Sequence, residues 1–145
     1  MPQTGSRHDP FAAFNFLIEI DGVTVGGFSE CSGLTTESDH IDYRTGAEDI
    51  TVRKLPGLRK YPNIVLKRGF TNSKELWEWR KKVINGKTER CPGSVRLLDE
   101  ARQPALTWNF REGWPCKWEG PALNGSTNAV AVETLEICHE GLELT

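Results

Sequence analysis

The chain has 145 residues, of which 37% are hydrophobic, and its formal net charge is −2 at pH 7. This length suffices for one domain with a hydrophobic core, and so low a net charge argues against nucleic acid or a membrane surface as a general partner. No apolar run approaches the ~20 residues of a membrane-spanning helix. Residues 1–10 are polar and lack the apolar core of a signal peptide, so we expect a short extension and then a single domain over residues 11–145, folded in a cytoplasm.

The first element predicted is a strand over residues 14–20. Its apolar side chains alternate with other side chains, at the period of a half-buried strand, and are Phe14, Phe16, Ile18 and Ile20. Asp21-Gly22 is typical of a type I′ turn, in which both central residues take positive φ. Val23 and Val25 then form the return strand of a hairpin.

Residues 35–43, TTESDHIDY, have one wholly polar face in any extended conformation. It consists of Thr36, Ser38, His40 and Asp42. With so little apolar surface, the segment is an edge strand, a loop, or part of a sheet with one face in water, and the sequence leaves all three open.

The following segment is rich in basic residues and turn signals. Ile50 and Val52 indicate a strand, Pro56-Gly57 a turn, and residues 63–67 another strand. We therefore expect a long hairpin arm between them, made of Arg53, Lys54, Leu55, Pro56, Gly57, Leu58, Arg59 and Lys60. It is either a solvated loop or a docking arm that meets acidic residues of a neighbouring subunit. Without interleaved aromatic residues, its charges are weak evidence for nucleic-acid binding.

One amphipathic helix is predicted within residues 71–86. Thr71 or Ser73 is expected to cap its start, and Gly86 to end it. Its apolar arc, expected to pack on a sheet, contains Leu76, Trp77, Trp79, Val83 and Ile84. The opposite polar face contains Lys74, Glu75, Glu78, Lys81, Lys82 and Asn85. We expect both tryptophans to be part of the core.

Strands return in the last third, over residues 94–98, 105–112 and 130–139, with 116–119 as a further short strand after a break at Trp114-Pro115. In the second of them, three apolar residues alternate with Thr107, Asn109 and Arg111. About seven strands and one helix favour a mainly β fold, an antiparallel sandwich or barrel with a flanking helix.

The sequence contains no convincing catalytic or metal-binding pattern. The segment Gly27–Cys31 departs from a nucleophile elbow at its fifth position, where Cys31 replaces glycine. A thiolate pair of Cys31 with His40 or His139 has no further support, and no CxxC pair indicates a zinc or redox site. We expect no enzyme activity, cofactor or metal, and we expect four free thiols packed as small apolar groups, at Cys31, Cys91, Cys116 and Cys138.

Blocks of sequence in order along the chain resemble the tail-tube proteins of contractile phage tails and phage-tail-like contractile injection systems. They are DPF (9–11), FNFLIEIDG (14–22), GGFSECSGL (26–34), YRTG (43–46), KLPG (54–57), LKRG (66–69), LWEW (76–79), LLDE (97–100), WPCKW (114–118), GPALN (120–124) and ETLEICHEGLEL (133–144).

The resemblance implies a β-sandwich subunit with a flanking helix, six copies of which close into a ring whose inner strands form one barrel. Rings stack into a hollow tube inside a contractile sheath, and contraction drives the tube through a target envelope to deliver cargo. The implied partners are other copies of the chain, sheath, baseplate and tube-terminating proteins, and luminal cargo or a tape-measure protein. The particle is assembled in the producing cell's cytoplasm.

The resemblance also assigns surfaces. The arm of residues 53–60 is expected to reach the adjoining ring. The lumen-facing candidates are Thr36, Ser38, His40, Asp42, Thr107, Asn109 and Arg111. The sheath-facing candidates on the helix are Lys74, Glu75, Glu78, Lys81 and Lys82.

Three alternatives stay open at the level of the sequence. The tube of a true phage would conduct DNA, and the ring protein of type VI secretion shares the architecture. A carbohydrate-binding β-sandwich is suggested by the five tryptophans, and it requires Trp108, Trp114 or Trp118 to be exposed. The sequence does not decide which strands face the lumen or whether any cysteines form disulfides.

Overall fold

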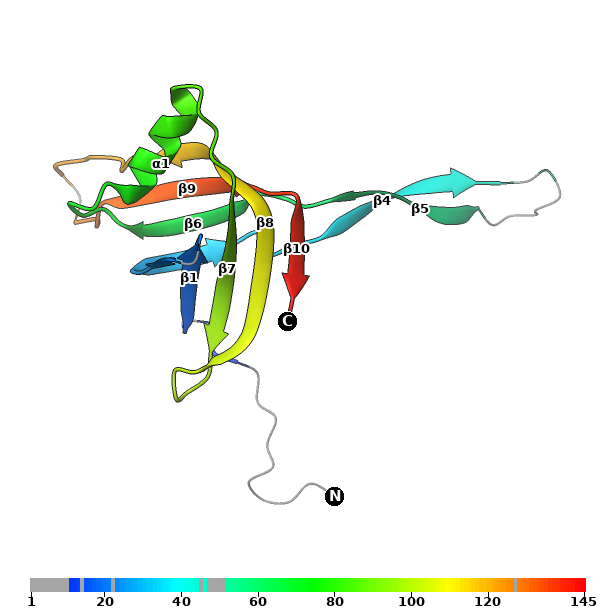
Figure 1. The fold of residues 1–145 in the computed structure, drawn as a ribbon, viewed down its shortest axis with the longest axis horizontal. Coiled ribbons are helices and arrows are strands. Elements are labelled where there is room, and N and C mark those ends of the chain that lie inside the picture. The colour runs from blue at the N-terminus through cyan, green and yellow to red at the C-terminus, as the bar shows by residue number, and fades with distance from the viewer. Residues whose placement is uncertain (1–10, 14, 22, 45, 47–51, 127) are drawn as a thin grey trace, which may run out of the picture.

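The computed structural model describes residues 11–145 except 14, 22, 45, 47–51 and 127. The described residues form ten strands and one helix (Figure 1). In chain order they are β1 (Phe16–Ile20), β2 (Val23–Val25), β3 (Phe28–Ser32), β4 (Glu37–Tyr43), β5 (Arg53–Lys60), β6 (Ile64–Gly69), α1 (Glu75–Ile84), β7 (Cys91–Leu98), β8 (Pro104–Glu119), β9 (Val132–Cys138) and β10 (Gly141–Leu144). The mainly β fold with one helix is as predicted.

Two antiparallel sheets make up the body of the molecule. The first sheet has the order β2-β1-β7-β8-β10, and the second has the order β8-β9-β6-β3. Figure 1 shows the strands of the second sheet running across those of the first. The strand β8 belongs to both sheets, since its first part pairs with β7 and its last part, from Trp114 to Glu119, pairs with β9.

The predicted break at Trp114-Pro115 is wrong, because β8 continues through it. The ladder with β9 has a bulge between Pro115 and Lys117, and bulges are among the few positions at which a sheet accepts proline. The Pro115 carbonyl also accepts a hydrogen bond from Arg80 Nη1 of α1 at 3.2 Å. The strand changes sheets where Glu112 takes a φ of 53° just before Gly113.

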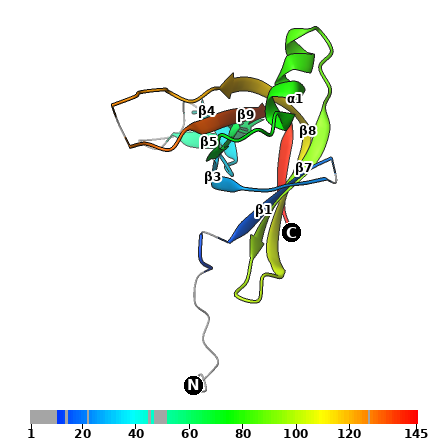
Figure 2. The same cartoon turned by 90° about the vertical axis from the view of Figure 1, so that its left-hand side faces the viewer.

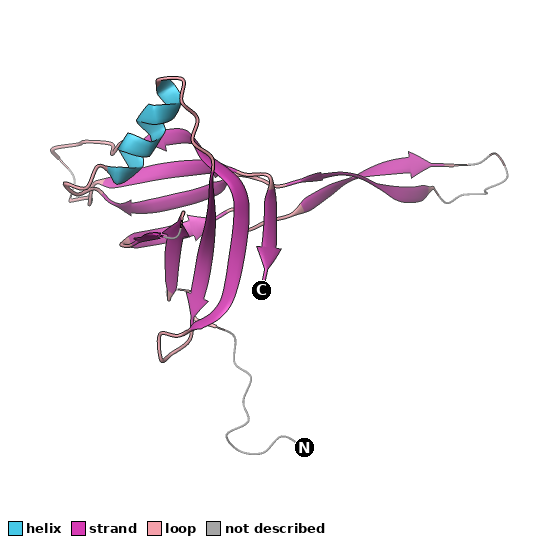
Figure 3. Cartoon of the chain, viewed as in Figure 1, coloured by secondary structure: helices cyan, strands magenta, loops and turns pink. Residues whose placement is uncertain are grey.

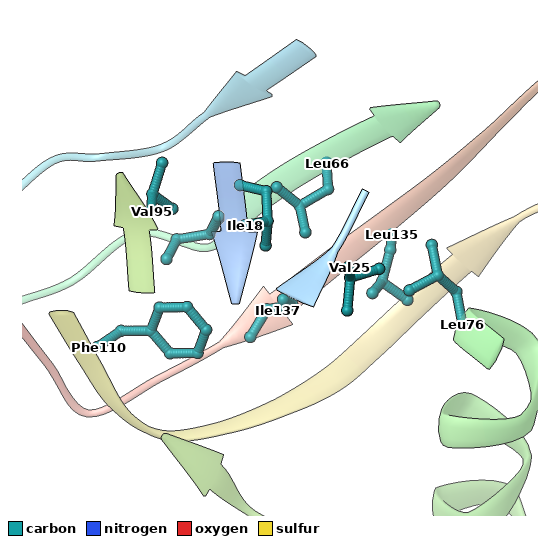
Figure 4. Packing of buried hydrophobic residues seen from close by; sticks show 9 residues of the cluster. Ile18, Val25, Leu66, Leu76, Val95, Phe110, Leu135 and Ile137 are labelled. Atoms are coloured by element: carbon teal, nitrogen blue, oxygen red, sulfur yellow. The ribbon is translucent and has the colours of Figure 1, made fainter. Parts of the chain in front are cut away.

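The core lies between the two sheets (Figure 4). Apolar residues from β1, β7 and β8 meet those from β6 and β9, and Leu76 of α1 closes one end. The ring of Phe110 occupies the space that a Cβ would need at Gly93 or Gly113, which explains glycine at both positions. The alternation predicted for the first strand is confirmed by Ile18, which is buried; Phe14 lies outside the described residues.

The hairpin of β1 and β2 is confirmed, with Ile20 opposite Val23. Asp21 has a φ of 54°, as the first central residue of a type I′ turn requires. The second, Gly22, lies outside the described residues.

The arm is a separate two-stranded sheet of β4 and β5 that projects from the body (Figure 3). Residues 37–43 are therefore a strand of the arm itself. The predicted turn at Pro56-Gly57 is wrong, because both residues lie inside β5 and Pro56 is opposite His40. The chain reverses direction between Tyr43 and Arg53, which are paired. Of the strand predicted from Ile50 and Val52, Ile50 lies outside the described residues and Val52 is not in a strand.

The helix α1 lies at one end of the body, away from the loop that joins β7 to β8 (Figures 1 and 2). Its N-cap is Lys74 without a side-chain hydrogen bond, so the predicted capping by Thr71 or Ser73 is wrong. The predicted end is confirmed, since Gly86 follows the C-cap with a φ of 84°.

The last third contains more strand than predicted. The strand predicted over 94–98 begins at Cys91, and the one predicted over 130–139 runs from Val132 to Cys138. β3 and β10 were not predicted at all, since neither has a long alternating pattern. β10 matters for the sheet order, because it forms one edge of the first sheet.

Candidate assembly surfaces

The arm has one charged face and one partly apolar face. On the charged face, Lys54 is opposite Asp42 and Arg59 is opposite Ser38. On the other face, Ile41 is opposite Leu55, next to Tyr43. These three side chains are 55%, 43% and 48% exposed. An isolated two-stranded hairpin is marginally stable in water, and exposed apolar side chains grouped on it indicate a surface that a partner covers.

The predicted lumen-facing residues lie on two separate surfaces. Ser38, His40 and Asp42 are on the charged face of the arm, and Thr36 precedes β4. The other three, Thr107, Asn109 and Arg111, are on β8 in the body. The sequence grouped them because both segments have a polar face, and that pattern carries no information on which sheet a strand joins.

The face of the first sheet that points away from the core is polar across four strands except at Leu17. One row of residues in register runs Glu19, Ser94, Asn109 and Glu143, and the next runs Leu17, Arg96, Thr107 and Thr145. Arg96 Nη2 lies 3.0 Å from Glu19 Oε2, and Asn109 Nδ2 donates to Thr145 Oγ1 at 3.4 Å. We call this surface the polar face of the first sheet.

A buried ion cluster connects the second sheet to the helix. Arg68 of β6 and Glu133 of β9 are opposite each other in the ladder and are 5% and 2% exposed. Arg68 Nε donates to Glu133 Oε1, and Arg68 Nη1 donates to Glu75 Oε1 of α1 at 2.7 Å. Trp118 Nε1 donates to the second oxygen of Glu133 at 3.1 Å.

Burial alone would lower the pKa of Arg68, but its hydrogen bonds to Glu75 and Glu133 outweigh that effect and raise the pKa above its ordinary value. The pair was missed at the sequence level. Strand alternation could have revealed it. Every second residue of β6 points inward, which places Arg68 on the same side as Ile64 and Leu66, and the same alternation in β9 places Glu133 with Leu135 and Ile137.

The predicted polar face of α1 is exposed at all five positions, Lys74, Glu75, Glu78, Lys81 and Lys82. Two of these have partners within the chain, since Glu75 binds Arg68 and Lys82 Nζ lies 2.9 Å from Glu89 Oε2. The other three, with Trp77 and Trp118, line a cavity of about 490 Å³.

The prediction that both tryptophans of the helix belong to the core is correct only for Trp79, which is half-buried against the core cluster. Trp77 remains 37% exposed, and its ring contacts that of Trp118 in a tilted arrangement at a centroid distance of 5.0 Å.

The model of the family described as T4-like virus tail tube protein gp19 matches residues 12–143. The chain belongs to this family of tail tube proteins. The resemblance seen in the sequence is thereby confirmed, and the family is one of structural tube proteins. No curated protein is significantly similar to the chain in sequence.

The fold of this tube protein is similar to that of solved particle components. A chain in the tube-terminating cap of the anti-feeding prophage has 25% identity and a TM-score of 0.88, covering 96% of this chain and 93% of that one. A chain in the sheath–tube complex of the extracellular contractile injection system PVC, in its extended state, has 24% identity and a TM-score of 0.85, covering 94% and 91%. A chain of the native gene transfer agent virion has 17% identity and a TM-score of 0.65, covering 94% and 99%.

The thiols and histidines of the tube protein show no nucleophile geometry in the part of the chain that the structure describes. Burial raises the pKa of the Cys31 thiol to about 11, which disfavours the thiolate. His139 has both ring nitrogens 3.1 Å from backbone carbonyls, of Gly141 and Pro62, and His40 lies on the arm. The four cysteines are free thiols. No group of three or more metal-ligating side chains occurs among the described residues.

Within the described ranges, no helix has the length and apolar character needed to cross a membrane.

The tryptophans test the alternative of a carbohydrate-binding protein. Trp108, Trp114 and Trp118 are half-buried, and Trp118 is in ring contact with Trp77 and Phe70. The exposed tryptophan platform that a carbohydrate-binding protein requires is therefore missing at these three positions.

The buried ion cluster generates a stability prediction. Glu133→Ala leaves the Arg68 guanidinium buried without its main counter-charge, so we expect a loss of about 3–5 kcal/mol in the free energy of unfolding, measured by urea denaturation. The matched control is Glu136→Ala on the same strand, whose partner Lys117 lies 3.6 Å away near the surface, and it should cost about 1 kcal/mol or less. Equal losses in the two variants would contradict the prediction.

Proposed function

We propose that this protein is the inner tube of a contractile injection system, in which six copies form a ring and rings stack into a hollow tube. Contraction of a surrounding sheath drives the tube through a target envelope to deliver cargo. The family match over residues 12–143 carries the proposal. The stronger likeness to components of contractile injection particles than to a gene transfer agent virion supports an injection system.

The open edges of the first sheet support ring formation. β2 and β10 end the sheet on its two sides, so each presents backbone groups that have no neighbouring strand among the described residues. Exposed edges of this kind promote association between sheets. We propose that six copies join these edges and so close one barrel, which removes the free edges.

The polar face of the first sheet is the proposed lumen wall, which includes the candidates Thr107, Asn109 and Arg111. The charged residues described on it balance in sign. Glu19 and Glu143 are accompanied by Arg96 and by Arg111, which follows Asn109 by two positions on β8 and is opposite Gly141. A channel for DNA is expected to be rich in carboxylates, which repel the phosphates. The balance favours a protein cargo or a tape-measure protein over DNA, the alternative of a phage tail. Under this proposal Ser38, His40 and Asp42 act on the arm.

The arm is the proposed contact between rings. Its apolar residues Ile41, Tyr43 and Leu55 supply area to bury, and its basic residues meet acidic groups of the adjoining ring. Lys60 Nζ is 3.0 Å from Asp39 Oδ1, so this basic residue has a partner within the arm, and Lys54 and Arg59 are the better candidates for contacts between rings.

The remaining assignments follow from the same proposal. The sheath binds the exposed face of α1, and baseplate and tube-terminating proteins bind the two tube ends. The protein performs no chemistry and needs no cofactor. It folds as one domain over residues 11–145 after the extension 1–10, is assembled in the cytoplasm of the producing cell, and becomes part of the particle.

Electron microscopy of the purified protein tests the central proposal. We expect rings, or hollow tubes of uniform width, in negative stain, because the open edges and the arm provide both types of contact. A protein that stays monomeric at high concentration, also when baseplate components are added to start assembly, would contradict it.

Reversal of charge on the arm tests the contact between rings. We expect Lys54→Glu with Arg59→Glu to abolish tube growth and to leave rings and the circular dichroism spectrum unchanged, since both side chains are exposed. Leu55→Ser should act in the same direction through the apolar face. The control is Lys87→Glu with Arg90→Glu, the same change of charge at exposed positions outside the arm. Normal tubes from the arm variants would exclude this role.

Reversal of charge on the helix tests the sheath contact. We expect Lys74→Glu with Lys81→Glu to prevent sheath assembly around tubes of normal width, because exposed charges meet the sheath there. The wild-type contact should weaken with rising salt, since exposed charges are screened. Sheathed particles from the variant at wild-type yield would show that the sheath binds elsewhere.

A further inference from the structure

Two of the four cysteines, Cys116 and Cys138, lie together on neighbouring strands of the second sheet. Cys138 ends β9 opposite Trp114 of β8, and Cys116 lies in the bulge of β8 between Pro115 and Lys117. The bulge places an extra residue of β8 beside β9. Neither thiol belongs to the hydrophobic core, and both are half-buried.

One amide side chain contacts both thiols. Asn63 Nδ2 donates to Cys116 Sγ at 3.5 Å, and Cys138 Sγ donates to Asn63 Oδ1 at 3.3 Å. Burial raises the pKa of the Cys116 thiol to about 12, and a hydrogen bond with the Cys138 thiol adds to the increase. The two thiols therefore contact the two ends of one amide group.

From this geometry we propose that Cys116 and Cys138 are a disulfide-forming pair, oxidised by small-molecule disulfides such as oxidised glutathione. Disulfides require side chains on neighbouring parts of the fold. The pairing of β8 with β9 places the two cysteines on adjacent strands, and their contacts with Asn63 bring both thiols to the same amide group. Cys31 is on β3 and Cys91 on β7, and neither has a thiol contact in the described structure that would make it a competing partner.

The exchange proceeds in two balanced steps. The thiolate of Cys138 attacks one sulfur of the reagent, which releases one small thiol and leaves a mixed disulfide on the protein. Cys116 then loses its proton to solvent and attacks the sulfur of Cys138, which releases the second small thiol. This second step is slow, because the raised pKa of Cys116 keeps the thiolate fraction low. The protein loses two S–H bonds and gains one S–S bond between β8 and β9, and the reagent is reduced to two thiols.

The bond would also change the root of the arm. Asn63 lies between the end of β5 at Lys60 and the start of β6 at Ile64. Oxidation removes the S–H group that donates to Asn63 Oδ1, so the disulfide strengthens the pairing of β8 with β9 while it removes a contact of the segment that connects the arm to the body. This part rests on the proposed function: a tube released from the producing cell would meet oxidising surroundings after it has assembled.

Thiol counting on the purified, folded full-length chain tests the pair. After oxidised glutathione is added, we expect the free thiols measured in denaturant to fall from four to two, and peptide mapping without reductant to show one peptide pair that joins residues 116 and 138. The melting temperature should rise by roughly 5–10 °C relative to the reduced chain, because the bond restricts the unfolded state.

Two variants make the outcome specific. Cys31→Ala with Cys91→Ala retains only the proposed pair and should still lose both thiols, whereas Cys138→Ala should form no internal bond. Four free thiols in the folded wild type, a bond that joins other cysteines or two molecules, or an unchanged melting temperature would each overturn the proposal. Failure here leaves tube formation in the microscope unaffected, so the two proposals fail separately.

Discussion

The strand β8 determines most of this structure, because it is a member of both sheets. Its first part pairs with β7 and β10, and its last part pairs with β9. The strand therefore bends from the first sheet into the second. The positive φ of Glu112, the glycine after it and the bulge at Pro115 allow that change without a loop. The core lies between the two sheets that β8 joins. The first part of β8 contributes to the polar face of the first sheet, and its last part contributes Trp118 to the buried ion cluster.

The sequence predicted correctly those features of the fold that depend on the local periodicity of apolar residues. Alternation placed Ile18 in the core, helical spacing located α1, and the glycine at position 86 marked its end. It failed where pairing with a distant strand overrides local propensity. Pro56-Gly57 has the residues of a turn, yet β4 pairs with that segment as a strand, and Trp114-Pro115 is accommodated by a bulge.

The candidate assembly surfaces were predictable only in part, for the same reason. The basic residues of the arm were visible in the sequence, but its apolar face arises from the register that sets Ile41 opposite Leu55. The link from Arg68 to Glu133 joins residues far apart in the chain, and so does the contact of Cys116 and Cys138 with Asn63. Such pairs are fixed by strand order, which a single sequence does not specify.

The position of the arm has a consequence for the proposed tube as a whole. It leaves the body on one side only (Figure 1), so the surface that it contacts on the next ring differs from the arm itself. A contact between two unlike surfaces does not close on itself when it is repeated along an axis. The proposed tube therefore has a direction and two chemically different ends, and repetition of this contact does not by itself limit its length.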